Sequence, residues 1–341
     1  MTVAAEGAFG AEILLPQRRV FVLSGVDEIT ALDRQLDDVA ARCGSPVTAR
    51  WPWIAGTLDD SGDCAAVLVE DDDGGLAAAA VLVTAADGVV RFASGGDGHR
   101  AAVPAADDDA AVRLSEGVWQ EIAARSSDGF ELGPMPADSI STQVLLDSAS
   151  ESVKVRESQV PVIRRRTLAT ASHYLTRNMR RTIRRGRNHV TVDGLEAVVR
   201  RSTDPDRIER ALPHLADLGR ERDRVAGRFG IFDDPAAAGR WQRRTIGLAR
   251  LGLAEMSALL INEAPAAVNV AFVDPPYYRV LEGRIDARFA RYAPGRLLEA
   301  DLLEGMHDDP RLTALDWMTS LAPEQLLAFN DYEPTVTISG A

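Results

Sequence analysis

The chain has 341 residues, and since domains usually hold roughly 100–200 residues, we expect two domains. Apolar residues make up 46% of the chain, charged residues 26%, and the formal net charge is −13, values typical of an ordinary globular protein. The longest nearly apolar run, Leu76 to Ala86, is shorter than the ~20 residues that span a bilayer, which excludes membrane insertion by a helix. Residues 1–12 lack a basic start followed by an apolar block, so we expect no secretory signal and a cytoplasmic protein.

The cysteines and histidines do not predict a metal site. Cys43 and Cys64 lie outside any Cys-x-x-Cys or Cys/His cluster, and the five histidines are scattered. A zinc site needs several such ligands at suitable spacing. We therefore expect two free thiols and no bound metal.

The first half of the chain mixes helical and strand patterns. Apolar residues recur at helical spacing in residues 27–43 and 110–125. Short apolar runs bounded by turn residues predict strands at residues 18–23, 65–69, 76–84, 89–93, 129–132 and 143–146. The polar stretch 148–159 then predicts a linker, so we place the two domains at residues 1–150 and 151–341.

The second half repeats this order of elements. Its patterns predict helices at residues 206–225, 241–251 and 297–306, and strands near residues 190–200, 255–261, 266–272, 277–281, 314–318 and 334–338. Each half thus has helices, then antiparallel strands, then a helix and two further strands. We infer an internal structural duplication.

A strongly basic segment joins the two halves: residues 164–192 hold nine arginines and no acidic residue. Leu175, Met179 and Ile183 recur every fourth residue and predict an amphipathic helix over residues 170–187, begun by Thr170 or Ser172 and ended by Gly186. The arginines on its other faces repel one another and need a partner. The acidic body of the chain, tRNA or another phosphate-bearing ligand, and an anionic membrane surface are the alternatives. The arginines assigned to docking a donor phosphate or tRNA are Arg177, Arg180, Arg181, Arg184 and Arg185.

One motif resembles a known family. Residues 284–298, RIDARFARYAPGRLL, resemble a segment of the CelD-like and Fem-like branch of the GNAT acyltransferase superfamily. In that segment an aspartate on a strand precedes an aromatic-rich stretch and a Pro-Gly turn that opens a helix. The Asp316-Trp317 pair and Trp51 to Trp53 match as well. The resemblance implies an α+β fold of tandem GNAT-like domains, each a mostly antiparallel twisted sheet flanked by helices.

The Pro-Gly turn is the candidate cofactor-binding segment. The first N–H groups of a helix lack partners within the helix and attract anions. In GNAT enzymes the corresponding turn holds the pyrophosphate of coenzyme A. Pro294, Gly295, Arg296 and Leu297 occupy it here. Tyr292 and Leu297 depart from the family pattern, which has glutamine or arginine and a second small residue at those places.

Three residues are candidates for catalysis. Asp286 matches the family's aspartate and is our first choice for the base that takes a proton from an attacking amine. Glu282, four residues earlier, should face the same side of a regular strand. Tyr292 could protonate the leaving group. The predicted substrate-binding residues are Arg224, Arg228 and Asp316. The two arginines are chosen because arginine binds two oxygens of a carboxylate or phosphate at once.

Three functions remain open at this stage. The first is transfer of an acyl group from an acyl-thioester donor, acyl-CoA, to a small-molecule or peptide amine or to a hydroxyl. The second is a Fem-like transfer from aminoacyl-tRNA, with the basic helix docking the tRNA. The third is a GNAT scaffold without catalytic activity.

Overall fold

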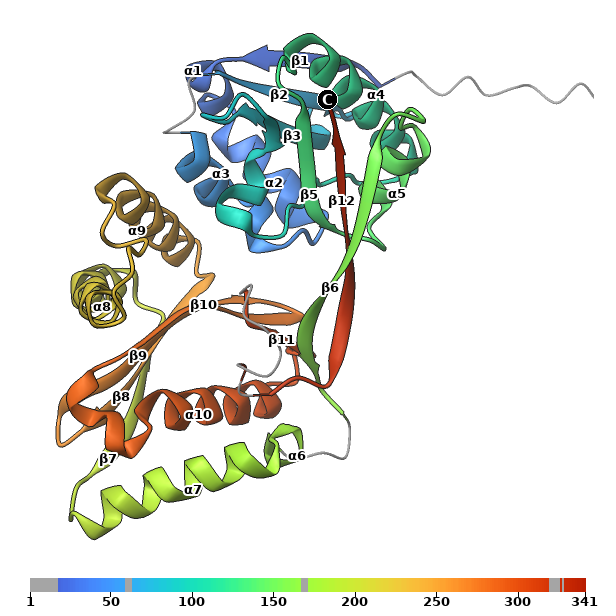
Figure 1. Cartoon of the computed structure of the whole chain (residues 1–341). Helices are drawn as coiled ribbons and strands as arrows, with labels where there is room; N and C mark the ends of the chain where they lie inside the picture. Colours follow the sequence, from blue (N-terminus) through green and yellow to red (C-terminus); the bar gives the residue numbers. More distant parts are fainter. Residues whose placement is uncertain (1–17, 59–62, 167–170, 319–325, 327) are drawn as a thin grey trace, which may run out of the picture.

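The computed structural model describes residues 18–58, 63–166, 171–318, 326 and 328–341. Within these ranges, twelve strands form one continuous mixed sheet in the order β1-β2-β3-β4-β5-β12-β6-β11-β10-β9-β8-β7 (Figure 1). No helix in the described ranges has both the length and the apolar character needed to cross a bilayer. Residues 1–12 and Thr170 lie outside these ranges.

In the first half, helices cover both faces of the sheet. The strands are β1 (Val20–Ser24), β2 (Asp63–Glu70), β3 (Leu76–Thr84), β4 (Val90–Phe92), β5 (Phe130–Pro136) and β6 (Lys154–Arg164). The helices are α1 (Val26–Thr30), α2 (Asp33–Arg42), α3 (Trp51–Leu58), α4 (Asp108–Arg125) and α5 (Ile140–Asp147), with 3-10 turns η1 (Val47–Ala49) and η2 (Ala93–Gly98). One apolar core lies under α4 and another under α2 and α3.

The second half has the same layered arrangement. Its strands are β7 (Ala197–Ser202), β8 (Ala254–Ile261), β9 (Ala264–Asp274), β10 (Tyr277–Ile285), β11 (Ala314–Asp316) and β12 (Asp331–Gly340). Its helices are α6 (Ala171–Tyr174), α7 (Arg177–Val192), α8 (Pro205–Val225), α9 (Pro235–Arg250) and α10 (Pro294–Asp308), with a 3-10 turn η3 (Ala287–Tyr292). Helix α10 packs on one face of the sheet and α8 and α9 on the other, each over its own apolar core (Figure 1).

The two halves share one topology. In each, a meander of antiparallel strands leads into a long helix, and the strand after that helix pairs in parallel with the last strand of the meander, as β4 does with β5 and β10 with β11. All other strand pairs described are antiparallel. The predicted α+β class, with mostly antiparallel sheets flanked by helices and repeated in tandem, is confirmed.

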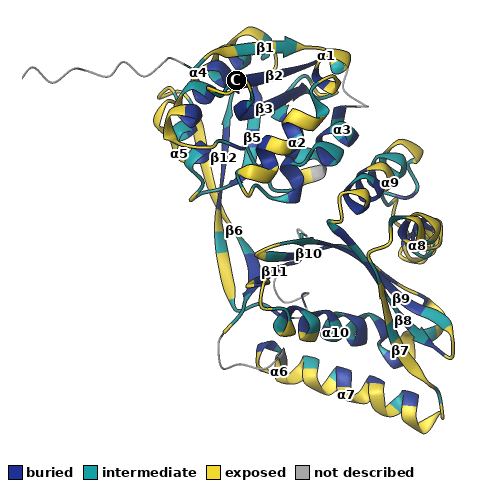
Figure 2. Ribbon diagram, turned by 180° about the vertical axis from the view of Figure 1, so that it is seen from behind, coloured by how far each residue is buried: buried dark blue, intermediate teal, exposed yellow. Residues whose placement is uncertain are grey.

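The predicted linker at residues 148–159 is wrong in its second part. Strand β6 begins at Lys154 and pairs with β12 as far as Val162, so β12 lies between β5 and β6. Residues 154–159 are polar because both faces of β6 are exposed where it joins the halves (Figures 1 and 2). The division into domains at residues 150 and 151 stays a prediction.

Two further local predictions are wrong. Residues 143–146 belong to helix α5 instead of a strand, because Ser139 accepts a hydrogen bond from the Thr142 N–H and starts a helix. The helix expected over residues 27–43 is divided into α1 and α2.

The basic segment differs from the predicted helix at both ends. Helix α7 begins after Thr176, whose side chain accepts from the Met179 N–H at 3.2 Å, and it continues through Gly186 to Val192. Gly186 does not end the helix. It is a glycine for another reason: a Cβ at this position would overlap the carbonyl oxygen of Tyr292. The glycine therefore lets α7 lie directly against the segment that opens α10.

A side chain at position 186 should destabilise this contact. Valine in place of Gly186 would displace the backbone at Tyr292, and overpacking of this kind costs about 1–3 kcal/mol. We expect the free energy of unfolding of Gly186→Val, measured by denaturant titration, to fall by that amount. Asn188→Ala, on the exposed face of α7, should change it little. Equal free energies of unfolding for the two variants would contradict the close packing.

Candidate functional site

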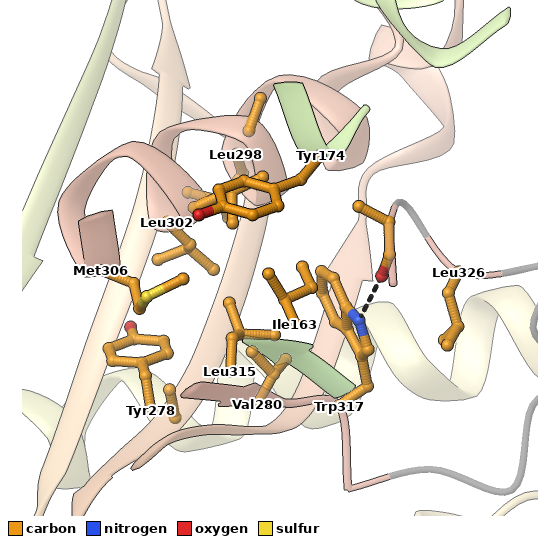
Figure 3. Packing of buried hydrophobic residues seen from close by; sticks show 14 of the residues in the cluster. Ile163, Tyr174, Tyr278, Val280, Leu298, Leu302, Met306, Leu315, Trp317 and Leu326 are labelled. Atoms are coloured by element: carbon orange, nitrogen blue, oxygen red, sulfur yellow. Dashed lines mark hydrogen bonds between the residues drawn. The ribbon is translucent and has the colours of Figure 1, made fainter. Parts of the chain in front are cut away.

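The site begins where β10 and β11 part. Strand β11 pairs with β10 only from Tyr277 to Arg279, yet β10 continues to Ile285. The rest of this edge of β10 has no strand partner in the described structure, and a cavity of about 600 Å³ lies beside it. Trp317 and Val280 lie at the base of the opening, and the Trp317 Nε1 donates to the Ala328 carbonyl at 2.9 Å (Figure 3).

Residues from four elements line this cavity, which we call the splay cavity. Strands β9 and β10 form its floor, the start of α10 forms one wall, and the segment around the end of α8 forms another. The lining residues used below are Arg222, Arg228, Asn269, Leu281, Glu282, Gly283, Arg284, Pro294, Gly295, Arg296 and Glu299.

A β-bulge shapes the open edge. The register between β9 and β10 shifts between Val280 and Glu282, so Leu281 has no paired residue on β9, and β11 has already ended. Bulges of this kind re-aim side chains next to functional sites. Here Leu281 and Glu282 are placed at the boundary of the splay cavity and a second cavity.

Glu282 is the best-placed carboxylate in the splay cavity. Its side chain is 19% exposed and accepts hydrogen bonds from Arg284 and from the Gly283 N–H. Burial raises the pKa of the Glu282 carboxyl above its ordinary value, although Arg284 opposes the shift. A raised pKa brings a carboxylate closer to the range in which it can exchange a proton with an amine.

Three arginines surround Glu282. The Arg284 guanidinium lies over the Phe232 ring at 5.4 Å, and burial lowers its pKa. Arg228 pairs with the buried Asp223 at 2.6 Å, and both Arg228 and Arg222 line the cavity. Arg222 forms no ion pair within the described ranges. Arg224, predicted to bind substrate, pairs with Glu221 on the surface and does not line the cavity.

The opposite wall contains the start of α10. Ala293 adopts a left-handed conformation (φ 50°) and provides no side-chain cap, so the Gly295 N–H remains as a donor behind Pro294. The cavity reaches Pro294, Gly295 and Arg296, as the sequence predicts. Leu297 instead packs into the core with α7 and leaves this approach open.

Two predicted catalytic residues lie outside the splay cavity. Asp286 caps η3 and binds the Arg288 guanidinium through both oxygens, which lowers the pKa of the Asp286 carboxyl. The Tyr292 hydroxyl donates to Asp193 at 2.7 Å, and this bond raises the tyrosine pKa. Neither side chain lines the cavity, so their catalytic roles stay predictions without support from the geometry.

Asp316 belongs to the second cavity, a space of about 840 Å³ between the two halves. Its buried carboxylate accepts hydrogen bonds from Arg279 at 2.7 Å and from Arg100 of the first half. Burial opposes ionisation, but these two arginines hold the pKa of Asp316 below its ordinary value. Arg100 also pairs with Glu333 of β12. The substrate-binding role predicted for Asp316 stays a prediction, and its contacts make it a tie between the halves.

The arginines of α7 are largely without acidic partners. Of the six, Arg187 pairs with Glu304 at 3.6 Å, Arg180 donates to the Leu175 carbonyl, and Arg185 to His189. Arg177, Arg181 and Arg184 are exposed and form no ion pair in the described structure. Figure 2 shows that the outer face of α7 is exposed. Acidic residues in the described ranges therefore leave Arg177, Arg181 and Arg184 without an ion pair.

The corresponding helix start in the first half differs from that of α10. Its helix α4 stands where α10 stands in the second half, but α4 is capped by Asp107 and carries Asp108 and Asp109 in its first turn. These carboxylates would repel phosphate. The space between β3, β4 and α2 is only about 10 Å³. The candidate site is confined to the second half and its boundary with the first.

The sequence reasoning missed four lining or supporting residues: Arg100, Asn269, Arg284 and Glu299. Asn269 could have been noticed as the polar residue in the apolar stretch AAVNVAF, and Arg284 as a charge inside a strand. Burial raises the pKa of the Glu299 carboxyl, which also accepts from Arg296 at 2.7 Å. In the described ranges, no group of three or more His, Cys, Asp or Glu side chains is arranged to hold a metal ion.

Comparisons with known proteins agree with this architecture. Residues 177–325 match the acetyltransferase (GNAT) domain family. Among solved structures, FemX is similar over 90% of this chain and 95% of its own (9% identity, TM-score 0.60). L-PGS from Bacillus licheniformis is similar over 90% and 91% (10% identity, TM-score 0.54), and a protein of unknown function from Bacteroides thetaiotaomicron over 92% and 95% (13% identity, TM-score 0.52). No curated protein matches the chain.

The matched range contains the basic helix and also the strands and the start of α10 that line the splay cavity. The structural likenesses extend over both halves and establish the fold. Residues 177–325 thus match the GNAT acetyltransferase domain family, and the chain as a whole has the fold of FemX.

Proposed function

We propose that this chain is an acyltransferase in which the splay cavity binds an acyl-thioester donor and Glu282 serves as the base. The observation that carries the proposal is the position of Glu282: a largely buried carboxylate with a raised pKa, at a β-bulge, on the boundary of two cavities. A base between two binding spaces can serve a donor on one side and an acceptor on the other.

The donor side fits an elongated molecule with amides and phosphates, such as acyl-CoA. The open edge of β10 from Val280 to Ile285 offers backbone donors and acceptors that a pantetheine arm can pair with, as an added strand does. The Gly295 N–H at the start of α10 lies at the other end of the cavity and suits a pyrophosphate. The donor supplies a thioester carbonyl carbon for attack.

The acceptor side is the cavity between the halves. Its lining includes Glu282 at one end and the carboxylates Asp138, Asp274, Asp316 and Glu333, against the cations Arg100, Arg164 and Arg279. This acidic balance favours an amine acceptor. Glu282 would take a proton as the amine nitrogen attacks the carbonyl carbon, the C–S bond would break, and the thiolate would leave and be protonated. The unpaired backbone at Leu281 lies beside this point and is the candidate donor to the oxyanion.

A second candidate function is transfer from aminoacyl-tRNA, as in the Fem-like proteins that the sequence resembles. The specific observation in its favour is the exposed arginine face of α7, where Arg177, Arg181 and Arg184 have no acidic partner in the described structure. Polyanion binding releases counterions and would offset the mutual repulsion of these arginines. Gly186 places this helix against the segment that opens α10, so the face adjoins the donor wall.

Coenzyme A should bind to the splay cavity, and a bulky residue at position 295 should weaken binding. The Gly295 position is tight, since its Cβ would lie 2.9 Å from Ile285, and a leucine would also cover the start of α10. We expect calorimetry to give an affinity at least about tenfold lower for Gly295→Leu. Gly239→Leu on α9, outside both cavities, is the matched control. Absence of CoA binding at millimolar concentration would refute an acyl-CoA donor.

Activity should rise with pH through the raised pKa of Glu282. The carboxyl must lose its proton to act as a base, so the rising limb should lie above the ordinary value of 4.5. We expect Glu282→Gln to lower kcat/KM by about 100-fold or more and to abolish this limb. The comparison variant is Asp286→Asn, because Asp286 has a lowered pKa and lies outside the cavity. If Asp286→Asn removes the limb and Glu282→Gln keeps it, the assignment is wrong.

If the donor is aminoacyl-tRNA, binding should depend on the unpaired arginines of α7. Replacing Arg177, Arg181 and Arg184 with glutamine should weaken tRNA binding and reduce the slope of log affinity against log salt by about two to three units. The control is a triple variant of exposed but ion-paired arginines: Arg207, Arg250 and Arg311. Identical salt slopes for the two triple variants would exclude docking on α7.

A further inference from the structure

The splay cavity contains a buried amide whose carbonyl oxygen has no hydrogen-bond partner in the described structure. Asn269 lies in the middle of β9, is 3% exposed and lines the cavity. Its Oδ1 is fully buried and has no hydrogen-bond partner in the described structure. Buried amides in proteins almost always have a hydrogen-bond partner, so this one needs an explanation.

Packing of the core does not explain it. Ala267 and Ala271, which share its face of β9, belong to an apolar cluster, and an apolar side chain of similar size would occupy the position without an unpaired polar group. An asparagine therefore makes the free protein less stable than a leucine would. A group that enters the cavity and hydrogen-bonds the amide would offset this cost.

The surroundings of Asn269 leave room for such a group. Gly283 of β10 is the cross-strand neighbour of Asn269, and a Cβ there would lie 3.3 Å from the Nδ2. Residues 283 and 285 share one face of β10, and Ile285 approaches Gly295 of α10, so this is the α10 face of the sheet. The amide thus lies on the donor side of the cavity, whereas Glu282 and Arg284 project from the other face.

The donor-side wall has few other polar groups. Val280, Leu298 and Trp317 make the inner part apolar, and the buried carboxyl of Glu299 is already paired with Arg296. A purely aliphatic acyl group would satisfy the apolar part and leave Asn269 unpaired. An acyl group with one hydrogen-bonding substituent would satisfy both.

We propose that Asn269 is a specificity-determining residue, which hydrogen-bonds an amino or hydroxyl substituent on the group being transferred. The cavity then prefers a hydroxyacyl or aminoacyl group to the unsubstituted acyl group of the same length. This inference rests on the proposed function and names its substrate class. The substituted acyl group can be carried by coenzyme A or by the 3′-terminal adenosine of a tRNA, and the test separates these carriers.

The test uses matched ligand pairs and calorimetry on the full chain. The first pair is 2-hydroxypropanoyl-CoA and propanoyl-CoA, with free CoA as the reference; the second carries the same acyl groups as 3′-amides of 3′-amino-3′-deoxyadenosine. We expect the hydroxylated member of the pair that binds to have about tenfold higher affinity, because a site built to hydrogen-bond a substituent discriminates against its absence. The carrier whose pair binds identifies the donor.

Two variants assign the preference to Asn269. Asn269→Leu should reduce the ratio of the two affinities to about one, leave the affinity for the carrier without an acyl group unchanged, and raise the denaturant midpoint of the free protein. Gly283→Ala keeps the amide but fills the space beside it, and should also lower the ratio. A preference retained in both variants, or equal affinities in the unmodified protein, would overturn the inference while leaving the proposed function intact. If neither carrier binds, the proposed function and the inference both fail.

Discussion

The buried carboxylate of Asp316 is the point on which the site depends. It closes the short parallel pairing of β11 with β10 by accepting from Arg279, the last paired residue of β10, and it reaches the first half through Arg100. Removing either arginine would leave a charge buried without its partner, which proteins tolerate poorly. The pairing of β10 with β11 is held by this ion pair and stops at Arg279, so the next residues of β10 lie apart from β11. The splay cavity begins where this ion network ends.

The same constraint explains why the two halves, though alike in topology, differ in chemistry. Strand β4 also pairs in parallel with its neighbour for a very short distance, at Val90 and Phe130. However, α4 begins with three aspartates, whereas α10 begins with Pro294 and Gly295 and has no acid in its first turn. One half thus provides a helix start without an acidic first turn, and the other provides Arg100, which pairs with Asp316 of the second half.

Much of this architecture could be predicted from local patterns. The order of strands and helices, the Pro-Gly start of α10 and the amphipathic character of α7 all follow from the spacing of apolar and turn residues. The roles of Gly186, Arg100 and Asn269 could not, since each depends on a contact between segments far apart in the sequence. Glu282 and Asp286 show the same limit. Their spacing predicts one side of a regular strand for both, but the splay cavity, which several elements form, reaches Glu282 and does not reach Asp286.

The net charge of the whole chain affects how the α7 arginines would attract an anionic donor. A net charge of −13 repels tRNA and coenzyme A alike at long range, so steering by the overall field cannot bring either donor to the site. Attraction must arise within a Debye length, about 8 Å at physiological ionic strength, where an arginine without an acidic partner keeps its full effect. Arg177, Arg181 and Arg184 satisfy this condition on a helix that Gly186 holds against the start of α10. An acidic chain with these three exposed arginines on α7 would discriminate against polyanions in general while retaining those that engage α7 and the splay cavity together.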